Sequence, residues 1–129
     1  MLTKSFNNPS PMGFSNSVSY TSNGVTTIHI SGQVGYDGKE VPAEISAQAD
    51  IAFANLVKEL HDAGAEVSDV VRLNAYIVDL DRERVTAVGH AKAKCFTQQN
   101  QPAATWVGVA ALLLPTLLVE IEATAVVEA

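Results

Sequence analysis

Two glutamates, Glu120 and Glu122, are the residues of this chain whose type and spacing could do chemistry. They interrupt the apolar run Leu117–Ala123, which otherwise has the composition of a buried strand. Residues two apart on a strand share one face of a sheet, so both carboxylates should face solvent, an oligomer interface or a pocket. In a dry pocket, desolvation and a neighbouring carboxylate raise the pKa of a glutamate, which can then transfer protons near neutral pH.

The other residues that could act as metal ligands or nucleophiles form no recognisable arrangement. His29, His61 and His90 are scattered over separate predicted elements without metal-ligand spacing, so we expect no metal site. Ser31 has no evident His and Asp partners, which argues against covalent catalysis. Cys95 is the single cysteine, which excludes an internal disulfide and a cysteine-cluster metal site, and on a predicted helix it is expected to be a buried, inert thiol.

Hydrophobic periodicity predicts two helices that could position the glutamates. The first runs from about Ala43, with apolar residues recurring at intervals of three and four, and ends just before Gly64. The second begins at about Asp81, whose side chain is expected to cap it. This second helix should direct one apolar face inward, made of Val85, Val88, Ala91, Cys95 and Phe96.

Alternating or β-prone runs predict the strands. A hairpin is expected where Asn23-Gly24 separates residues 18–22 from residues 25–31, because this dipeptide favours a tight turn. Residues 2–6 could form a short first strand, followed by an irregular loop over Asn7–Asn16. Further strands are predicted at residues 70–78, 105–112 and 117–127.

This order of elements predicts a single α+β domain spanning residues 1–129. Two helices of this size can cover one face of the sheet, in a two-layer arrangement. The last strand is apolar at Val119 and Ile121 and again at Leu118 and Val126 on its other face. The uncovered sheet face should therefore be apolar, and we expect a homo-oligomer that packs sheet against sheet with Glu120 near the interface.

Composition narrows the classes of function. The chain is 47% hydrophobic and 17% charged, as is typical of a globular protein, and its net charge of −6 disfavours nucleic-acid binding, which normally requires a basic patch. No segment has the length of a membrane span, and the N-terminus lacks the continuous apolar stretch of a signal peptide. We therefore expect a cytoplasmic protein with no nucleic-acid or membrane partner.

Several short motifs occur along the chain in a fixed order: Ser31-Gly32-Gln33, Gln48 with Asn55, Ala63-Gly64, Pro102-Ala103-Ala104-Thr105 and Val119–Ala125. In this order and spacing they resemble the Rid family, also called YjgF and formerly L-PSP. The resemblance covers nearly the whole chain and implies a chorismate-mutase-like fold, with a six-stranded mixed sheet and two helices packed on one face. It also implies a homotrimer with clefts between subunits, and hydrolysis of enamines and imines such as 2-aminoacrylate without a metal or organic cofactor.

The resemblance also implies roles for individual residues. Glu120 falls at the position of the carboxylate that orients or activates water in the hydrolytic branch. Ser31 and Gly32 fall where the family lines its cleft, Gly32 through its backbone. Thr105 occupies the Ser or Thr position that follows the family's substrate-binding arginine.

Three polar positions of the family's cleft are changed in this chain. Ala104 stands in place of the substrate-binding arginine, Phe14 stands where a tyrosine is usual, and Gly89 replaces an asparagine on the second helix. Loss of a bidentate carboxylate clamp should weaken the binding of small keto-acid imines. Ala104 and Trp106, two apart on one strand, should share a face and, with Phe14, make the cleft wider, drier and more aromatic, although a tryptophan on a strand is more often part of a core or subunit interface.

Two functions remain open from the sequence. The first is a Rid-like imine or enamine hydrolase, or a tautomerase, whose substrate needs no carboxylate clamp and whose water or proton is handled by Glu120. The second is a non-catalytic trimer that binds a small aromatic ligand or protects other proteins. Retention of Glu120 favours the enzyme, whereas Ala104 in the arginine's place favours the binding protein.

Overall fold

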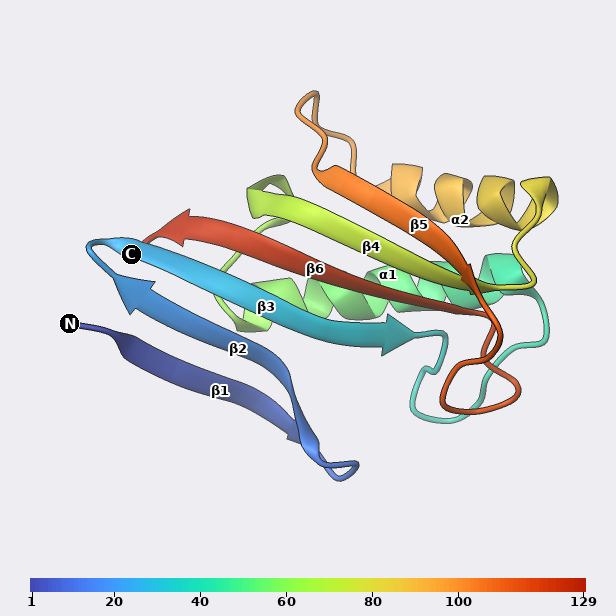
Figure 1. The fold of residues 1–129 in the computed structure, drawn as a ribbon, viewed down its shortest axis with the longest axis horizontal. Helices are drawn as coiled ribbons and strands as arrows, with labels where there is room; N and C mark the ends of the chain where they lie inside the picture. The colour runs from blue at the N-terminus through green and yellow to red at the C-terminus, as the bar shows by residue number, and fades with distance from the viewer.

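The computed structural model describes residues 1–129 and contains one six-stranded sheet (Figure 1). The strands lie in the order β1-β2-β3-β6-β4-β5, and every neighbouring pair is antiparallel except β4 and β5, which are parallel. The sheet is therefore mixed. Its strands are β1 Thr3–Ser10, β2 Phe14–Ser22, β3 Val25–Val34, β4 Val70–Val78, β5 Ala103–Val109 and β6 Val119–Glu128.

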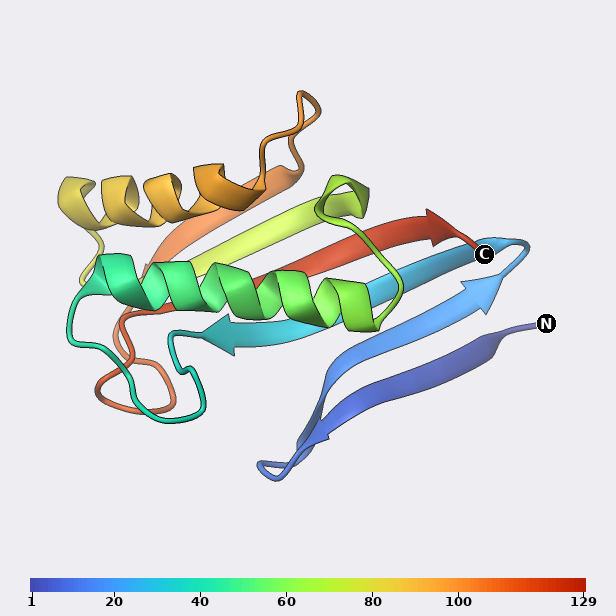
Figure 2. The same ribbon diagram turned by 180° about the vertical axis from the view of Figure 1, so that it is seen from behind.

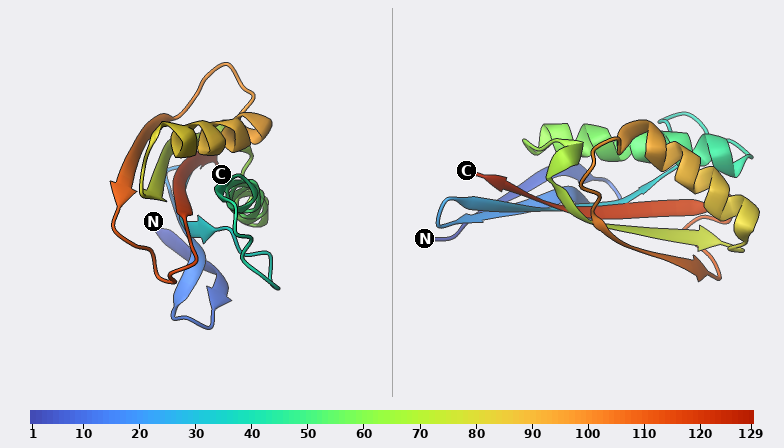
Figure 3. Two further views of the ribbon diagram at one scale, coloured as in Figure 1. Left: turned by 90° about the vertical axis from the view of Figure 1, so that its right-hand side faces the viewer. Right: turned by 90° about the horizontal axis from the view of Figure 1, so that it is seen from above.

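Both long helices, α1 (Ile45–Asp62) and α2 (Arg82–Cys95), cover the same face of the sheet (Figures 2 and 3). The crossover from β4 through α2 to β5 follows from parallel pairing, because parallel neighbours cannot be joined by a tight turn. A short 3₁₀ helix, Val67–Asp69, leads into β4. None of the helices combines the length and the apolar character that a membrane crossing requires.

The core lies between the sheet and the two helices. Alternate residues of the central strands are fully buried there, as the two-residue period of a strand requires. Phe53 of α1 and Phe96 after α2 meet edge to face, with ring centroids 6.0 Å apart. The sheet side of the core is made by Ile28, Ile30, Leu73, Ala75, Ile77, Val119 and Ile121, and the helix side by Ala49, Ala52, Phe53, Leu56, Leu60, Val88 and Ala91.

Most of the predicted elements are confirmed. Strand β4 has the predicted bounds, the turn at Asn23-Gly24 joins β2 to β3, and Gly64 follows the end of α1 with a positive φ of 91°. The Asp81 side chain accepts a hydrogen bond from the Arg84 backbone N–H at 2.8 Å, so it caps α2 as expected. The predicted α+β class, with a six-stranded mixed sheet and two helices on one face, is therefore the fold that forms.

Two local predictions are wrong. Residues 7–16 are not an irregular loop but the tip of a second hairpin, in which β1 and β2 pair from Thr3↔Thr21 to Ser10↔Phe14 around a turn at Gly13. Polar side chains hid this hairpin, because it extends past the helices and gains no buried apolar face (Figure 1). Val85 does not point inward but is 38% exposed, because α2 lies over the edge strand and buries only a narrow stripe.

The expected apolar character of the uncovered sheet face is also wrong at its centre. Side chains that alternate with the buried core residues of β3, β6 and β4 are mostly polar and include three charged groups. Apolar residues lie at the ends of that face, around Val34 and Val126, and on the flanking strands, where Val18 is opposite His29 and Val107 is opposite Tyr76. The continuous apolar patch that the sequence predicted is therefore interrupted by polar residues at the centre of the sheet. The polar residues of this face include Glu120 at the Val34 end and, nearer the centre, His29, Arg72, Asn74, Tyr76, Glu122 and Thr124.

Candidate functional site

Glu120 lies in the most apolar pocket of the molecule, a cavity of about 430 Å³ at one end of the uncovered sheet face. Its volume falls in the range of small-molecule sites. Eight of the ten lining residues are apolar, and Glu120 is the only charged one. The lining residues are Met12, Phe14, Gly32, Val34, Tyr36, Val41, Leu113, Leu114, Leu117 and Glu120.

The Glu120 carboxyl group is half-buried and has a raised pKa. Desolvation by the apolar surroundings is the main cause, and the charge of nearby Glu122 raises the pKa further. No hydrogen bond contributes to this shift. The structure thus shows the two causes that the sequence predicted, and leaves the carboxyl oxygens free to bind a water molecule or a ligand.

The backbone beside Glu120 is shaped by a β-bulge. Pairing between β3 and β6 shifts register between Ile30, opposite Ala123, and Gln33, opposite Ile121. Ser31 and Gly32 together therefore lie opposite the single residue Glu122, which is the two-against-one count of a bulge. Bulges of this kind turn the strand locally and are common beside binding sites.

Gly32 is required for the position of Glu120. A Cβ atom added to Gly32 would lie 2.6 Å from Cδ of Glu120 and closer still to Oε2, far inside van der Waals contact. The backbone of β3 therefore approaches the carboxyl group as closely as only glycine allows. This contact gives a physical basis for the cleft-lining role that the resemblance implies for Gly32.

Glu122, unlike Glu120, is tied into a hydrogen-bond network on the same face. Its Oε1 accepts hydrogen bonds from the Tyr76 hydroxyl and from Nδ2 of Asn74, the latter at 3.3 Å. Hydrogen bonding to Glu122 is the main reason that the pKa of Tyr76 is raised. The two glutamates therefore differ in environment: Glu122 is a partnered acceptor, and Glu120 faces the pocket without a partner.

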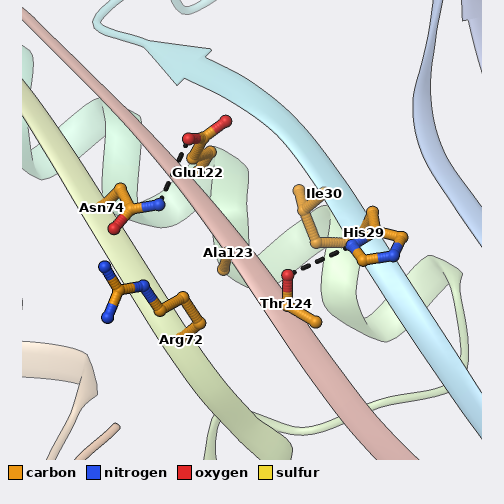
Figure 4. Close-up of a pocket in the computed structure, with 7 residues that line it drawn as sticks. All are labelled: His29, Ile30, Arg72, Asn74, Glu122, Ala123 and Thr124. Atoms are coloured by element: carbon orange, nitrogen blue, oxygen red, sulfur yellow. Dashed lines mark hydrogen bonds between the residues drawn. The ribbon is translucent and has the colours of Figure 1, made fainter. Parts of the chain in front are cut away.

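A second, polar pocket of about 240 Å³ lies farther along the same face (Figure 4). Figure 4 shows Arg72 and Asn74 projecting from β4, Glu122 and Thr124 from β6, and His29 from β3. The Thr124 hydroxyl and Nδ1 of His29 are 3.1 Å apart, and the Arg72 guanidinium donates to the Thr105 hydroxyl at 2.6 Å. Most of the polar residues at the centre of the uncovered sheet face line this pocket.

The structure brings together some of the predicted site residues but not others. Phe14, Gly32 and Glu120 line one pocket. The Ser31 hydroxyl donates to the Ser15 backbone carbonyl at 2.6 Å, so it is engaged in holding β2 against β3.

Ala104, Thr105 and Trp106 lie on the edge strand, away from Glu120. Ala104 is paired with Leu73 and Trp106 with Ala75, two residues that face the helices. Trp106 accordingly lies over α2, with its Cη2 atom 3.9 Å from a Cβ placed on Gly89. Within one chain, Ala104 and Trp106 share a face as predicted, but it is the face opposite Glu120. Thr105 is on the uncovered face, bonded to Arg72.

Sequence reasoning missed most of the apolar wall of the pocket. Met12, Tyr36, Val41, Leu113 and Leu114 all come from turns and loops that no periodicity marks. One signal was available: the run Leu112-Leu113-Leu114 before Pro115 is unusually apolar for a loop, and Leu113 is 72% exposed. An apolar, exposed loop is a common sign of a binding surface.

No group of three or more His, Cys, Asp or Glu side chains is placed so that it could hold a metal ion. Among the residues that line the apolar pocket, Glu120 is the one whose carboxyl group can transfer a proton.

Comparison with known proteins gives a family. The sequence model of the family described as Endoribonuclease L-PSP matches residues 9–127. A 2-iminobutanoate/2-iminopropanoate deaminase from Dermatophagoides farinae is 35% identical over 106 residues, which cover 79% of each chain.

Solved structures agree with this match. A protein of unknown function of the Rid family from Yersinia pestis is 36% identical, with a TM-score of 0.72 and coverage of 95% of this chain and 97% of the other. A member of the YjgF/YER057c/UK114 family from Mycobacterium tuberculosis is 30% identical, with a TM-score of 0.77 and coverage of 97% and 100%. RidA from the Antarctic bacterium Psychrobacter sp. is 28% identical, with a TM-score of 0.76 and coverage of 92% and 93%.

Proposed function

The chain belongs to the family described as Endoribonuclease L-PSP, also called YjgF or Rid, and from that premise we propose that it hydrolyses imines or enamines, with Glu120 as the proton-transfer group. A relative named as an imine deaminase, 35% identical to this chain, supports the reaction class. Hydrolysis of RNA is disfavoured by the net charge of −6, since nucleic-acid sites are normally basic.

One observation carries the proposal. Glu120 is an unpartnered, half-buried carboxyl group with a raised pKa in a pocket that is otherwise apolar. Such a group exists as a mixture of acid and carboxylate closer to neutral pH than an exposed glutamate does. It can therefore both accept and return a proton during one catalytic cycle.

The chemistry follows from this property of Glu120. Water attacks the carbon of a protonated imine while the Glu120 carboxylate accepts a proton from it, which gives a neutral carbinolamine. The Glu120 carboxyl group then returns that proton to the amine nitrogen. As the C–N bond breaks, its electron pair leaves with the nitrogen, and the C=O bond forms while the Glu120 carboxylate accepts the hydroxyl proton. Glu120 then passes this proton to the departing ammonia, so the products are a ketone or aldehyde and an ammonium ion. Glu120 ends the cycle as a carboxylate, so no other acid or base is consumed.

The apolar lining indicates the kind of substrate. Phe14, Tyr36, Leu113 and Leu114 offer contacts for an aliphatic or aromatic side chain, and the lining holds no cation to bind a substrate carboxylate. Ala104, in place of the family's arginine, removes the usual carboxylate clamp. We therefore propose that the substrates are imines with a large apolar side chain. These imines carry a neutral group at the position where keto-acid imines carry a carboxylate.

The direct test is a coupled assay. Imines generated in situ from apolar primary amines by an amine oxidase, and from amino acids by an amino-acid oxidase, are mixed with the protein while ammonia release is followed. Faster release from the neutral apolar imines than from the keto-acid imines is expected. No acceleration with any imine, together with saturable binding of an aromatic ligand, would instead favour the non-catalytic binding protein that Ala104 suggests.

A second copy of the chain is needed if Ala104 and Trp106 belong to the same site as Glu120, because one chain places them on opposite faces of the sheet. We propose a homotrimer, as the resemblance implies, with each cleft built from two chains. Light scattering on a gel-filtration peak should give three times the 13.6 kDa of one chain. A monomer at micromolar concentration would contradict a shared cleft.

Restoring the arginine tests both the missing clamp and the shared cleft. Ala104→Arg should raise kcat/KM for keto-acid imines by about tenfold, a part of the 3 to 5 kcal/mol that a desolvated ion pair can involve. Only a partial gain is expected, since a guanidinium in an apolar site costs stability when it has no partner. Ala104→Gln is the control of similar length without the charge. If the wild type is already fast on keto-acid imines, another group has replaced the clamp and the altered substrate class is wrong.

A further inference from the structure

Five of the eight apolar residues that line the Glu120 pocket come from two connections rather than from strands. One joins the end of β3 at Val34 to the start of α1 at Ile45 and carries Tyr36 and Val41. The other joins β5 to β6 and carries Leu113, Leu114 and Leu117. Loops have no hydrogen-bond ladder of their own, so the width of this wall must be fixed by contacts with the rest of the molecule.

Gln48, in the first turn of α1, makes contacts of this kind with both connections. Its Nε2 donates hydrogen bonds to the Pro42 carbonyl and to the Thr116 carbonyl, each at 2.9 Å. Its Oε1 accepts a hydrogen bond from the Leu118 backbone N–H at 2.8 Å. The Gln48 side chain is fully buried and thus uses both of its donors and its acceptor to join segments about 70 residues apart.

Two further contacts show that this junction is tightly built. A Cβ atom on Gly35 would lie 2.6 Å from Cα of Gln48, so the first connection runs directly against α1. Two turns farther along the same helix, Asn55 Nδ2 donates to the Val34 and Tyr36 carbonyls, each at 3.0 Å. Helix α1 therefore holds the Tyr36 side of the wall at two points, and the Leu113–Leu117 side through Gln48.

We propose that Gln48 is a positioning residue that sets the width of the Glu120 pocket, and thereby its preference for imines with a large aliphatic or aromatic side chain. The substrate preference rests on the proposed function. Gln48 itself does not line the pocket and acts through the two connections. Without its amide, the Pro42 and Thr116 carbonyls lose a buried donor, and the two sides of the wall are no longer held in register.

Two variants test this role. Gln48→Glu keeps the shape and the acceptor for Leu118 but replaces both donors with an oxygen that faces two carbonyls. Gln48→Met keeps the length without any charge, so it serves if the glutamate variant does not fold. Gln99→Glu is the matched control, because Gln99 is exposed and the same charge is added away from the pocket.

The first measurement compares kcat and KM for a bulky imine, derived from 2-phenylethylamine, and a small one, derived from ethylamine. KM for the bulky imine should rise about tenfold in both Gln48→Glu and Gln48→Met, with little change in KM for the small imine or in either kcat. Gln99→Glu should match the wild type. Equal changes for both imines, or a loss confined to kcat, would overturn a role in setting pocket width.

The second measurement does not depend on turnover. Amide hydrogen exchange in residues 36–44 and 111–118 should accelerate in Gln48→Met while exchange in β4 stays slow, because only the junction is loosened. Binding of 2-phenylethylamine, followed by methyl signals of Leu113 and Leu114, should weaken in parallel. If the wild type hydrolyses no imine, the proposed function fails, yet these two readouts still decide the role of Gln48. Unchanged exchange and unchanged binding would refute it.

Discussion

Replacing Glu120 with Gln should lower the turnover of any active imine by about 10²-fold or more, while the fold and the assembly stay intact. The amide keeps the size of the carboxyl group but cannot accept and return a proton. Glu122→Gln is the matched control, two residues away on the same strand face. It should cost much less, because an amide oxygen still accepts from Tyr76 and Asn74.

The pH dependence gives this prediction a second readout. As a base, Glu120 must be ionised, so the rate should fall as the pH drops through its pKa, which lies above the ordinary value of 4.5. Glu122→Gln removes a nearby negative charge that raises this pKa. The acid limb of its pH–rate profile should therefore move to lower pH. A limb that does not move, or equal losses of activity from both variants together with unfolding, would make the pair a structural feature of the sheet.

Stability should change in the opposite sense to activity. A carboxyl group whose pKa is raised in the folded state lowers the free energy of unfolding once it ionises. This loss of stability begins as the pH rises through 4.5 and is complete above the pKa of the group in the folded protein. Glu120→Gln avoids that cost. Its melting temperature should equal or exceed that of the wild type at pH 7, and the difference should vanish near pH 4. A lower melting temperature at pH 7 would show that the carboxylate has a structural partner.

Gly32→Ala should reduce turnover by a similar factor, about 10²-fold, although it removes no ionisable group. The added methyl group overlaps Cδ and Oε2 of Glu120, so the carboxyl group must leave its position or the bulge must shift. Circular dichroism and the melting temperature measure how much of the effect is loss of fold. Any loss of activity in a variant that remains folded measures the effect of displacing the Glu120 carboxyl group.

A double-mutant cycle separates these two effects. If Gly32→Ala acts only by displacing Glu120, it should cause no further loss of activity in the Glu120→Gln background. Losses that multiply would mean that Gly32 serves the reaction independently, for example through its backbone. Full activity in the single variant would show that the pocket tolerates a displaced carboxyl group, and would contradict the role proposed for Glu120.

The fold of this protein was largely determined by local sequence patterns. Strand β4 alternates Leu73, Ala75 and Ile77 with polar residues, and helix α2 begins at the Asp81 cap, so both could be placed without tertiary information. These signals are local because the period of an element and the chemistry of its ends depend on near neighbours in the chain. That Glu120 and Glu122 lie on the same face of one strand followed from the two-residue period of a strand.

Where local signals were weak, the tertiary structure decided. The hairpin of β1 and β2 has no clear apolar alternation, and its pairing from Thr3 to Thr21 is set by the turn at Gly13 and by β3 beyond it. The inward face of α2 depends on where the helix sits over the sheet, which the helical period alone cannot give. Val85 is therefore exposed although it falls on the apolar stripe.

The site shows the same division. The sequence by itself identified Glu120, and the resemblance added Gly32 and Phe14, and these three meet in one pocket. The sequence could not show on which face of the sheet Ala104 and Trp106 lie, because the direction of a side chain on an edge strand depends on the register with β4. Nor could it find the wall of Tyr36, Val41 and Leu113, since loops carry no period. That wall is formed by contacts between residues distant in sequence, such as Gln48 with Thr116, and only the folded chain brings these residues together.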